Sequence, residues 1–136
     1  MVAKTKQSNA AQKAHAVLTN RMADAQQVLG PALTVMLKIQ AALVSQFMQT
    51  QGFWESDNTG EKIALMHSEL SEALEADRMN LDAEHIPGFT GVEEELADVI
   101  IRILDFAGHH QLRLGEALSA KIAYNLTRPF KHGKAY

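Results

Sequence analysis

The chain has 136 residues, a length that suits a single domain with a core of its own. Its formal net charge of −3 at pH 7 excludes a general electrostatic attraction to nucleic acid or to an anionic membrane. The absence of cysteine excludes disulfides and thiolate chemistry. No uninterrupted apolar run approaches the ~20 residues of a membrane span, and the N-terminus lacks the apolar segment of a signal peptide. A cytoplasmic protein is expected, with neither a membrane nor a nucleic-acid polymer as partner.

Hydrophobic periodicity in the first half of the chain predicts two helices. Residues 1–8 are polar and are expected to be frayed. A helix rich in Ala and Gln is predicted from Ala10 to about Leu29. Gly30-Pro31 is expected to end it, because glycine favours the position after a helix and proline favours the first turn of the next one. The second helix, from Pro31 to about Thr50, has a wide apolar face that comprises Leu33, Val35, Met36, Ile39, Ala42, Leu43 and Phe47.

Three more helices are predicted after the loop at residues 51–60. They cover residues 60–79, then residues 91 to 111 or 114, and finally residues 115 or 116 to about 127. In the first of the three, the core face is expected to comprise Ile63, Met66, Leu70 and Leu74. No strand-like alternation is present. The predicted fold is therefore all-α: a bundle of four core helices over residues 31–136, with an N-terminal extension, residues 1–30, that holds an extra helix.

Two acid pairs stand out in the middle of the chain. Glu69 and Glu72 are three residues apart on one predicted helix, and Glu95 and Asp98 are three apart on the next. Residues at this spacing share a helix face, so like charges there oppose helix formation by roughly 0.2–0.5 kcal/mol per pair. The presence of two such pairs is explained by a bound cation, by exposure of that face to solvent, or by a capping role.

Capping accounts for only some of the acids. Thr90 and Glu93 fit a capping box, and Glu94 in the same first turn complements the helix dipole. Asp98 lies two turns into its helix, and Glu69 and Glu72 lie about three turns past the start of theirs, so no cap explains them. Spacing alone leaves a solvated acidic face and a metal site equally open.

Three motifs in a fixed order carry a resemblance to a known family. Glu69-Leu70-Ser71-Glu72 is followed, after 22 intervening residues, by Glu95-Leu96-Ala97-Asp98, and then by Lys121-Ile122-Ala123-Tyr124-Asn125. This set resembles the MazG-type all-α nucleoside triphosphate pyrophosphatases over roughly Pro31 to Tyr136. Residues 1–30 have no counterpart in that family.

The resemblance implies an enzyme that hydrolyses a nucleoside triphosphate, an NTP or dNTP, to the monophosphate and pyrophosphate. Glu69, Glu72, Glu95 and Asp98 would hold Mg²⁺, or Mn²⁺ in its place, which agrees with the preference of hard cations for oxygen ligands. A glutamate of the first pair, Glu69 or Glu72, would be the catalytic base. A homodimer or homotetramer is expected, as in relatives.

The substrate-binding residues are expected on the last helix and near the first loop. Lys121, Asn125 and Arg128 share a helix face and would bind phosphate or sugar, with the basic tail residues Lys131 and Lys134 beyond them. Candidates for contact with the nucleotide base are Phe47, Phe53 and Trp54. For Trp54 the alternative is a lid packed on the core.

The histidines and the helical architecture raise alternatives to the proposed metal site and to the proposed activity. No Glu here has a His three residues later, so the pattern of a di-iron bundle is missing. His67, His109 and His110 are interpreted as boundary or surface residues. The competing function is a non-catalytic helical module for nucleotide binding or assembly. A related enzymatic alternative is pyrophosphohydrolysis of a phosphoribosylated nucleotide in histidine synthesis.

Overall fold

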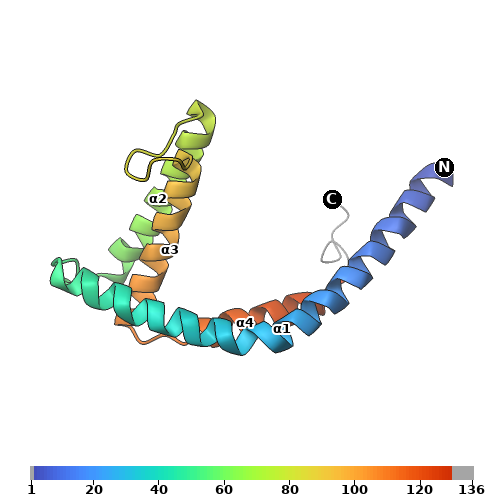
Figure 1. The fold of residues 1–136 in the computed structure, drawn as a ribbon, viewed down its shortest axis with the longest axis horizontal. Coiled ribbons are helices and arrows are strands. Elements are labelled where there is room, and N and C mark those ends of the chain that lie inside the picture. Colours follow the sequence, from blue (N-terminus) through green and yellow to red (C-terminus); the bar gives the residue numbers. More distant parts are fainter. Residues whose placement is uncertain (1, 130–136) are drawn as a thin grey trace. The chain divides into compact units, whose positions relative to one another are not determined.

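The structure is a computed structural model that describes the backbone of residues 2–129 and the side chains of residues 10–129. It contains four helices (Figure 1): α1 (Val2–Thr50), α2 (Thr59–Met79), α3 (Gly91–His109) and α4 (Leu114–Leu126). Residues 2–129 form no strand, only an isolated bridge between Asp82 and Thr90. The all-α prediction is confirmed, with four helices in place of the five expected.

The predicted helix boundary at Gly30-Pro31 is wrong, because α1 runs unbroken through it. A proline inside a helix costs ~3 kcal/mol, yet the hydrogen bonds of the turns on either side of Pro31 remain. Gly30 has a different role from ending a helix. It is buried, and a Cβ there would lie 2.9 Å from Gln26 Nε2 and 3.7 Å from Ser119 Oγ on α4. The expected fraying of residues 1–8 is also wrong for residues 2–8, which are helical.

The chain forms two compact units, and α1 contributes to both. Unit 1 comprises Met1–Met36 and Arg113–Tyr136, and unit 2 comprises Leu37–Leu112. Unit 1 thus combines the first part of α1 with α4. Unit 2 combines the last turns of α1 with α2 and α3.

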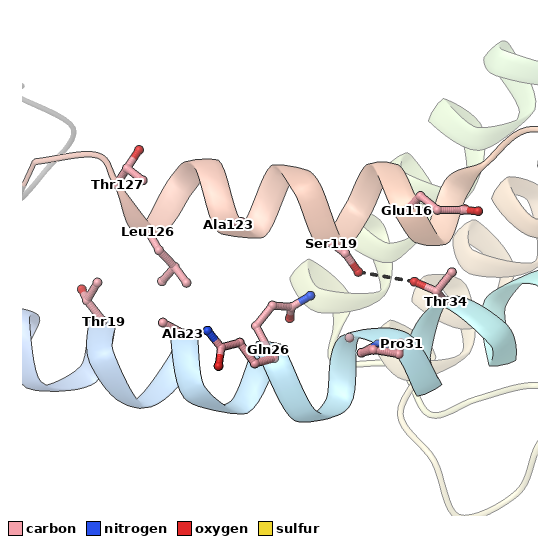
Figure 2. Close-up of a pocket in the computed structure, with 12 residues that line it drawn as sticks. Thr19, Ala23, Gln26, Pro31, Thr34, Glu116, Ser119, Ala123, Leu126 and Thr127 are labelled. Atoms are coloured by element: carbon pink, nitrogen blue, oxygen red, sulfur yellow. Dashed lines mark hydrogen bonds between the residues drawn. The ribbon is translucent and has the colours of Figure 1, made fainter.

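In unit 1, α4 lies against α1 through small residues (Figure 2). A Cβ on Gly115 would lie 2.7 Å from Thr34 Cα, so only glycine permits this approach. One turn further along α4, the hydroxyl groups of Ser119 and Thr34 are 3.5 Å apart. The contact between these helices is therefore built from glycine and hydroxyl residues.

In unit 2, α2 and α3 form a helical hairpin whose ends are all capped (Figure 1). The Asn58 side chain accepts a hydrogen bond from the Glu61 N–H, which opens α2. Asn80 closes α2 in the left-handed region at φ 53°. The predicted capping box of Thr90 and Glu93 is confirmed at the start of α3.

The face of α2 that packs on α3 differs from the predicted one. Ile63, Leu70 and Leu74 were expected in the core but are 44–49% exposed, whereas Met66, the fourth residue of that face, is half-buried. The buried residues of α2 are instead Glu69, Ala73 and Ala76, which share a face at i, i+4 and i+7. Alanine lets helix backbones approach closely, and the approach places the Glu69 carboxylate in the contact between α2 and α3.

The apolar face of α1 is largely exposed. Val35, Met36, Ile39, Leu43 and Phe47 are each more than half exposed, whereas Ala41 and Ser45 are buried in unit 2. Within the described part of the chain, α1 over Ala10–Thr50 is long and apolar enough to cross a membrane. Helices packed inside soluble proteins and signal sequences share that length and composition, so the cytoplasmic location stays a prediction.

We expect Gly108→Ala to destabilise the protein by about 1–3 kcal/mol, the usual cost of overpacking. A Cβ at Gly108 would lie 2.1 Å from the Ala41 carbonyl oxygen and 2.7 Å from Ser45 Cβ, and backbone cannot move aside as a flexible side chain can. Urea denaturation measures the change. Gly60→Ala is the control: its Cβ would meet only Asn58 Oδ1, at 3.4 Å, so its stability should equal or exceed that of the wild type. Equal stabilities of the Gly108→Ala protein and the wild type would contradict the packing described for α1 and α3.

Candidate metal centre between α2 and α3

Three of the four predicted metal ligands converge in unit 2. Glu69 on α2 and Glu95 and Asp98 on α3 each offer a carboxylate oxygen, and these oxygens all lie within 4.8 Å of one another. Glu69 is buried, and the other two are half-buried. The two acid motifs, which are distant in the sequence, thus meet across the hairpin.

The fourth predicted ligand, Glu72, lies at the edge of this group. Its side chain is exposed and accepts a 2.9 Å hydrogen bond from Ser68 Oγ, one turn earlier on α2. Its charge still reaches the group, because it contributes to the raised pKa of Glu95.

The pKa of Glu95 is raised above its ordinary value of 4.5. Burial is the largest cause, followed by the negative charges of Glu72, Asp98, Glu69 and Glu94. Burial and the neighbouring negative charges thus both disfavour the ionised form of Glu95.

Arg102 is a member of this site that the sequence analysis missed. Its Nε donates a 3.0 Å hydrogen bond to Glu69 Oε1, and its guanidinium carbon lies 5.7 Å from the centroid of the Phe53 ring. The available signal was its spacing, four residues after Asp98 on the same helix face. Arg102 links the carboxylates to the loop between α1 and α2.

The donor set fits a hard divalent cation. All the candidate ligand atoms are carboxylate oxygens, the type that Mg²⁺ prefers, and Mn²⁺ accepts the same set. Four carboxylates against the single guanidinium of Arg102 leave three negative charges uncompensated among these five side chains. A divalent cation would relieve the repulsion that raises the pKa of Glu95.

The other acids at the start of α3 are structural, as predicted. Burial would raise the pKa of Glu94, but hydrogen bonds from the backbone N–H groups of Glu84 and His85, with the His85 ring, outweigh burial and lower it. The backbone and hydroxyl of Thr90 lower the pKa of Glu93 in the capping box. Neither side chain belongs to the three converging carboxylates.

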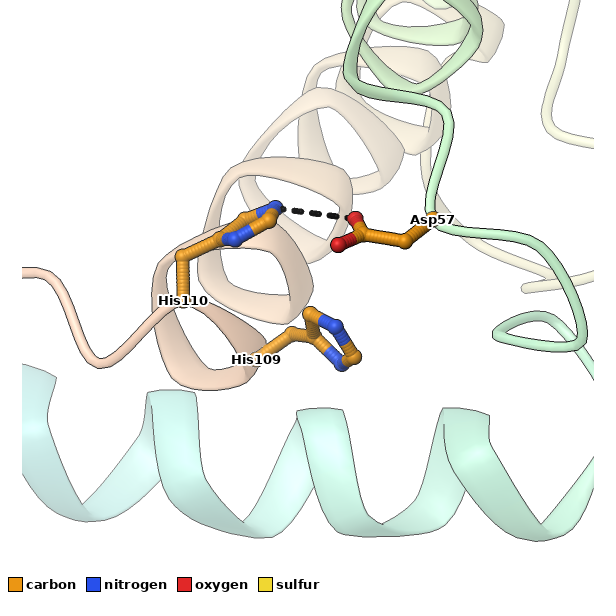
Figure 3. Close-up of side chains that lie close together, drawn as sticks. All are labelled: Asp57, His109 and His110. Atoms are coloured by element: carbon orange, nitrogen blue, oxygen red, sulfur yellow. Dashed lines mark ion pairs between the residues drawn. The ribbon is translucent and has the colours of Figure 1, made fainter.

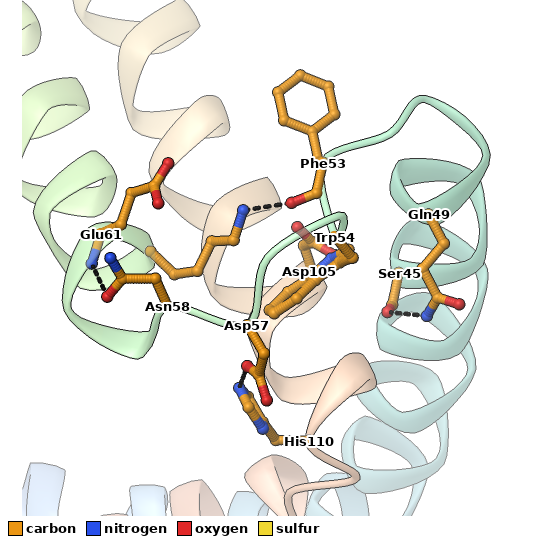
Figure 4. A network of polar contacts seen from close by, with 10 residues as sticks. Ser45, Gln49, Phe53, Trp54, Asp57, Asn58, Glu61, Asp105 and His110 are labelled. Carbon is orange, nitrogen blue, oxygen red and sulfur yellow. Dashed lines mark hydrogen bonds and ion pairs between the residues drawn. The ribbon is translucent and has the colours of Figure 1, made fainter.

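Trp54 is held within the protein (Figure 4). Its Nε1 donates a 2.7 Å hydrogen bond to the buried Asp105, and its ring stacks on His109 with centroids 3.5 Å apart. These contacts favour the alternative in which Trp54 packs on the core over one in which its ring is free to contact a nucleotide base. Phe53 and Phe47 are exposed, and their contact with a base stays a prediction.

Lys121, Asn125 and Arg128 belong to unit 1. Lys121 and Asn125 are exposed on α4, and the Lys121 ammonium lies 5.0 Å from the centroid of the Tyr124 ring. Arg128 follows the end of α4 and is half-buried. Their role as phosphate or sugar ligands stays a prediction, and Lys131 and Lys134 lie outside the described residues.

A pocket of about 720 Å³ separates α1 from α4 within unit 1 (Figure 2). The residues that line it are Thr19, Ala23, Gln26, Gln27, Gly30, Pro31, Thr34, Glu116, Ser119, Ala123, Leu126 and Thr127. Lys121 lies two residues from Ser119 and from Ala123, about 200° around the helix, and so faces away from the pocket. Without lysine or arginine among these lining residues, the pocket does not suit a polyphosphate.

A second cluster in unit 2 was not foreseen from the sequence. Asp57, His109 and His110 bring a carboxylate and two imidazoles together, with potential ligand atoms within 4.8 Å of one another (Figure 3). Both histidines are half-buried, in agreement with the boundary position expected for them. Their proximity to Asp57 depends on how the loop before α2 folds over the end of α3.

Comparisons of the chain with protein-family models, with curated proteins and with solved structures found no match. The resemblance to MazG-type pyrophosphatases therefore rests on the sequence motifs and stays a prediction.

We expect Glu95→Gln to stabilise the metal-free protein at neutral pH. Because the folded-state pKa of Glu95 is raised, wild-type stability falls as pH rises from the unfolded-state value of about 4.5 through the folded-state pKa. The variant lacks this fall, so its urea midpoint should exceed that of the wild type at neutral pH and approach it near pH 4.5.

Glu93→Gln is expected to change the stability of the protein in the opposite direction. The lowered pKa of Glu93 contributes stability above the unfolded-state pKa, which is lost as pH falls through the folded-state pKa. This variant should therefore be less stable than the wild type at neutral pH. A destabilised Glu95→Gln protein at neutral pH would contradict the carboxylate repulsion.

Proposed function

We propose that the protein is a Mg²⁺-dependent nucleoside triphosphate pyrophosphohydrolase. The observation that carries the proposal is the meeting of Glu69, Glu95 and Asp98 within 4.8 Å across the α2–α3 hairpin. A site that gathers like charges at a cost to stability is more readily explained by a cationic ligand than by the fold itself. The order and spacing of the motifs add the expectation of a nucleotide substrate.

The proposed reaction consumes one water molecule. The water oxygen bonds to the α-phosphorus, the bond from that phosphorus to the α–β bridging oxygen breaks, and pyrophosphate leaves with the electron pair of that bond. The products are the nucleoside monophosphate and pyrophosphate, and the proton of the water passes to a carboxylate. Bound Mg²⁺ would supply charge neutralisation for the triphosphate and a lowered pKa for its bound water.

The residues of this chain would hold and orient the reacting groups. Asp98, Glu95 and Glu69 would provide the oxygen ligands. Glu69 or Glu72 is proposed as the base, with Arg102 fixing the Glu69 carboxylate through its 3.0 Å hydrogen bond. Phe47 and Phe53 are proposed to contact the base, and the assignment of Lys121, Asn125 and Arg128 to phosphate or sugar stays a prediction from the sequence.

We expect Asp98→Asn and Glu95→Gln to lower pyrophosphate release by about 100-fold or more, because losing a metal ligand forfeits several kcal/mol of charge stabilisation in the transition state. Purified protein is incubated with Mg²⁺ and a panel of ribo-, deoxy- and modified triphosphates and a phosphoribosylated nucleotide, and pyrophosphate is measured. Chelation should abolish release, and added Mg²⁺ should restore it.

The matched control is Glu75→Gln, which removes an exposed carboxylate from the same helix. It should retain wild-type activity. Absence of pyrophosphate release by the wild type from every substrate in the panel, or full activity of the Asp98→Asn protein, would contradict the proposed enzyme.

A second candidate function, an assembly module, is favoured by the exposed face of α1. Ile39, Leu43 and Phe47 recur at i, i+4 and i+8 and are 53%, 57% and 60% exposed. A continuous apolar patch on a helix is typical of a protein contact. We propose that copies of the chain pair through this face, as a homodimer or homotetramer, which is compatible with either function.

We expect the double variant Ile39→Glu/Leu43→Glu to dissociate into monomers, because it would bury uncompensated charge in the proposed contact. Sedimentation velocity of the full chain measures the oligomeric state. Lys38→Glu, which changes the charge of the same stretch of helix at an exposed position about 100–180° around the helix from these residues, should leave the wild-type state unchanged. A monomeric wild type across a concentration series would contradict pairing through α1.

A further inference from the structure

We propose that Asp57, His109 and His110 form a second metal site, which takes a divalent transition ion of the Zn²⁺ class. The site lies in unit 2, where the loop before α2 meets the end of α3 (Figure 3). It does not depend on the carboxylates of Glu69, Glu95 and Asp98, nor on the proposed hydrolysis.

The distances suit an ion between the side chains better than a direct contact. His110 Nε2 lies 3.6 Å from Asp57 Oδ1, beyond the usual 2.7–3.2 Å of an N–H···O hydrogen bond. Two ligand atoms about 2.0–2.2 Å from a tetrahedral Zn²⁺ lie about 3.4 Å apart. The wider spread of the group, up to 4.8 Å, requires side-chain shifts of about 1 Å to close on the ion.

Two buried nitrogen atoms at the site have no hydrogen-bond partner among the described residues. They are His109 Nδ1 and His110 Nε2. Leaving a buried polar atom unsatisfied costs roughly 1–3 kcal/mol, so native structures usually provide a partner. A metal ion coordinated by His110 Nε2 would satisfy that nitrogen and bridge it to Asp57.

The end of α3 explains how two adjacent histidines can share a target. Neighbours on a regular helix point about 100° apart and would diverge. Here α3 ends at His109, Gln111 takes the left-handed conformation at φ 52°, and the Leu112 N–H bonds the Ala107 carbonyl at 2.8 Å. At this capped end the centroids of the two imidazole rings lie 4.9 Å apart.

Aromatic side chains hold the imidazoles in place. The Trp54 ring stacks on His109 with an interplanar angle of 4°, and the Phe106 ring lies 4.3 Å from His110. Trp54 is in turn fixed by its hydrogen bond to Asp105, seen beside the site in Figure 4. Ligands held by such a shell lose little freedom when they bind an ion.

The donor types select the class of ion. Imidazole nitrogens suit Zn²⁺ and its transition-metal neighbours, whereas Mg²⁺ prefers an all-oxygen set such as the carboxylate cluster. Three protein ligands would leave a coordination position for water, as in open zinc sites.

The test is calorimetric titration of the full chain with Zn²⁺, in excess Mg²⁺ to occupy the carboxylate cluster. Co²⁺ titration, read by its visible absorption, reports on the ligand geometry. We expect one Zn²⁺ per chain with histidine-type coordination, and at least tenfold weaker binding for Asp57→Asn and for His110→Gln. The control His67→Gln, at an exposed histidine on α2, should bind as the wild type does.

Asp57→Asn decides the outcome even if His110→Gln fails to fold, because the Asp57 side chain is 64% exposed and the change is isosteric. Unchanged Zn²⁺ affinity in a folded Asp57→Asn protein, or no binding by the wild type, would overturn the proposal. So would loss of Zn²⁺ binding on Glu95→Gln, since the ion would then occupy the carboxylate cluster.

Discussion

The close approach of α2 to α3 is the constraint on which the candidate site depends. Ala73 and Ala76 are buried in this contact, and a Cβ on Gly91 would lie only 3.0 Å from Ala76 Cβ. Because the contact is made by such small residues, Glu69 on the same face is carried into it. Its carboxylate then meets Glu95 and Asp98, whose charges repel it. The geometry that stabilises the hairpin thus also concentrates negative charge, and that charge is what a cation would bind.

Arg102 and the loop between α1 and α2 connect this charge to the rest of unit 2. The guanidinium pairs with Glu69 and lies over the Phe53 ring, and the next residue in that loop, Trp54, bonds Asp105 on α3. The Lys62 ammonium on α2 donates a hydrogen bond to the carbonyl of Phe53. The loop is therefore fastened to both helices of the hairpin. Asp57, which belongs to the same loop, is thereby placed beside His109 and His110.

Small apolar side chains are buried in this protein, whereas many large ones are exposed. The buried hydrophobic residues are mostly alanines, with Leu104 the largest of them. Many large aliphatic residues of α1 and several of α2 are exposed instead. Burying such side chains contributes about 1.5–3 kcal/mol each, so a partner surface that covered them would stabilise the assembly considerably. The proposed enzymatic site and the proposed assembly role are therefore compatible in one chain.

The sequence by itself determined what depends on neighbours along the chain. The all-helical class followed from periodicity, the capping box from Thr90 and Glu93, and the structural role of Glu94 from its place in the first turn. The i, i+3 spacing also showed that Glu95 and Asp98 share a face. Each of these properties is set within one or two helical turns, where local sequence specifies geometry.

Tertiary structure decided what depends on contacts between helices. Gly30-Pro31 has the sequence of a helix end, yet the turns on both sides of it continue as one helix. On α2, periodicity favoured the bulky stripe of Ile63, Leu70 and Leu74, whereas close packing selected the alanine face that carries Glu69. The pairing of Arg102 with Glu69 and the meeting of Asp57 with His110 join residues 33 and 53 positions apart, which no local pattern encodes. Packing between backbones, rather than side-chain hydrophobicity alone, fixed which groups came together.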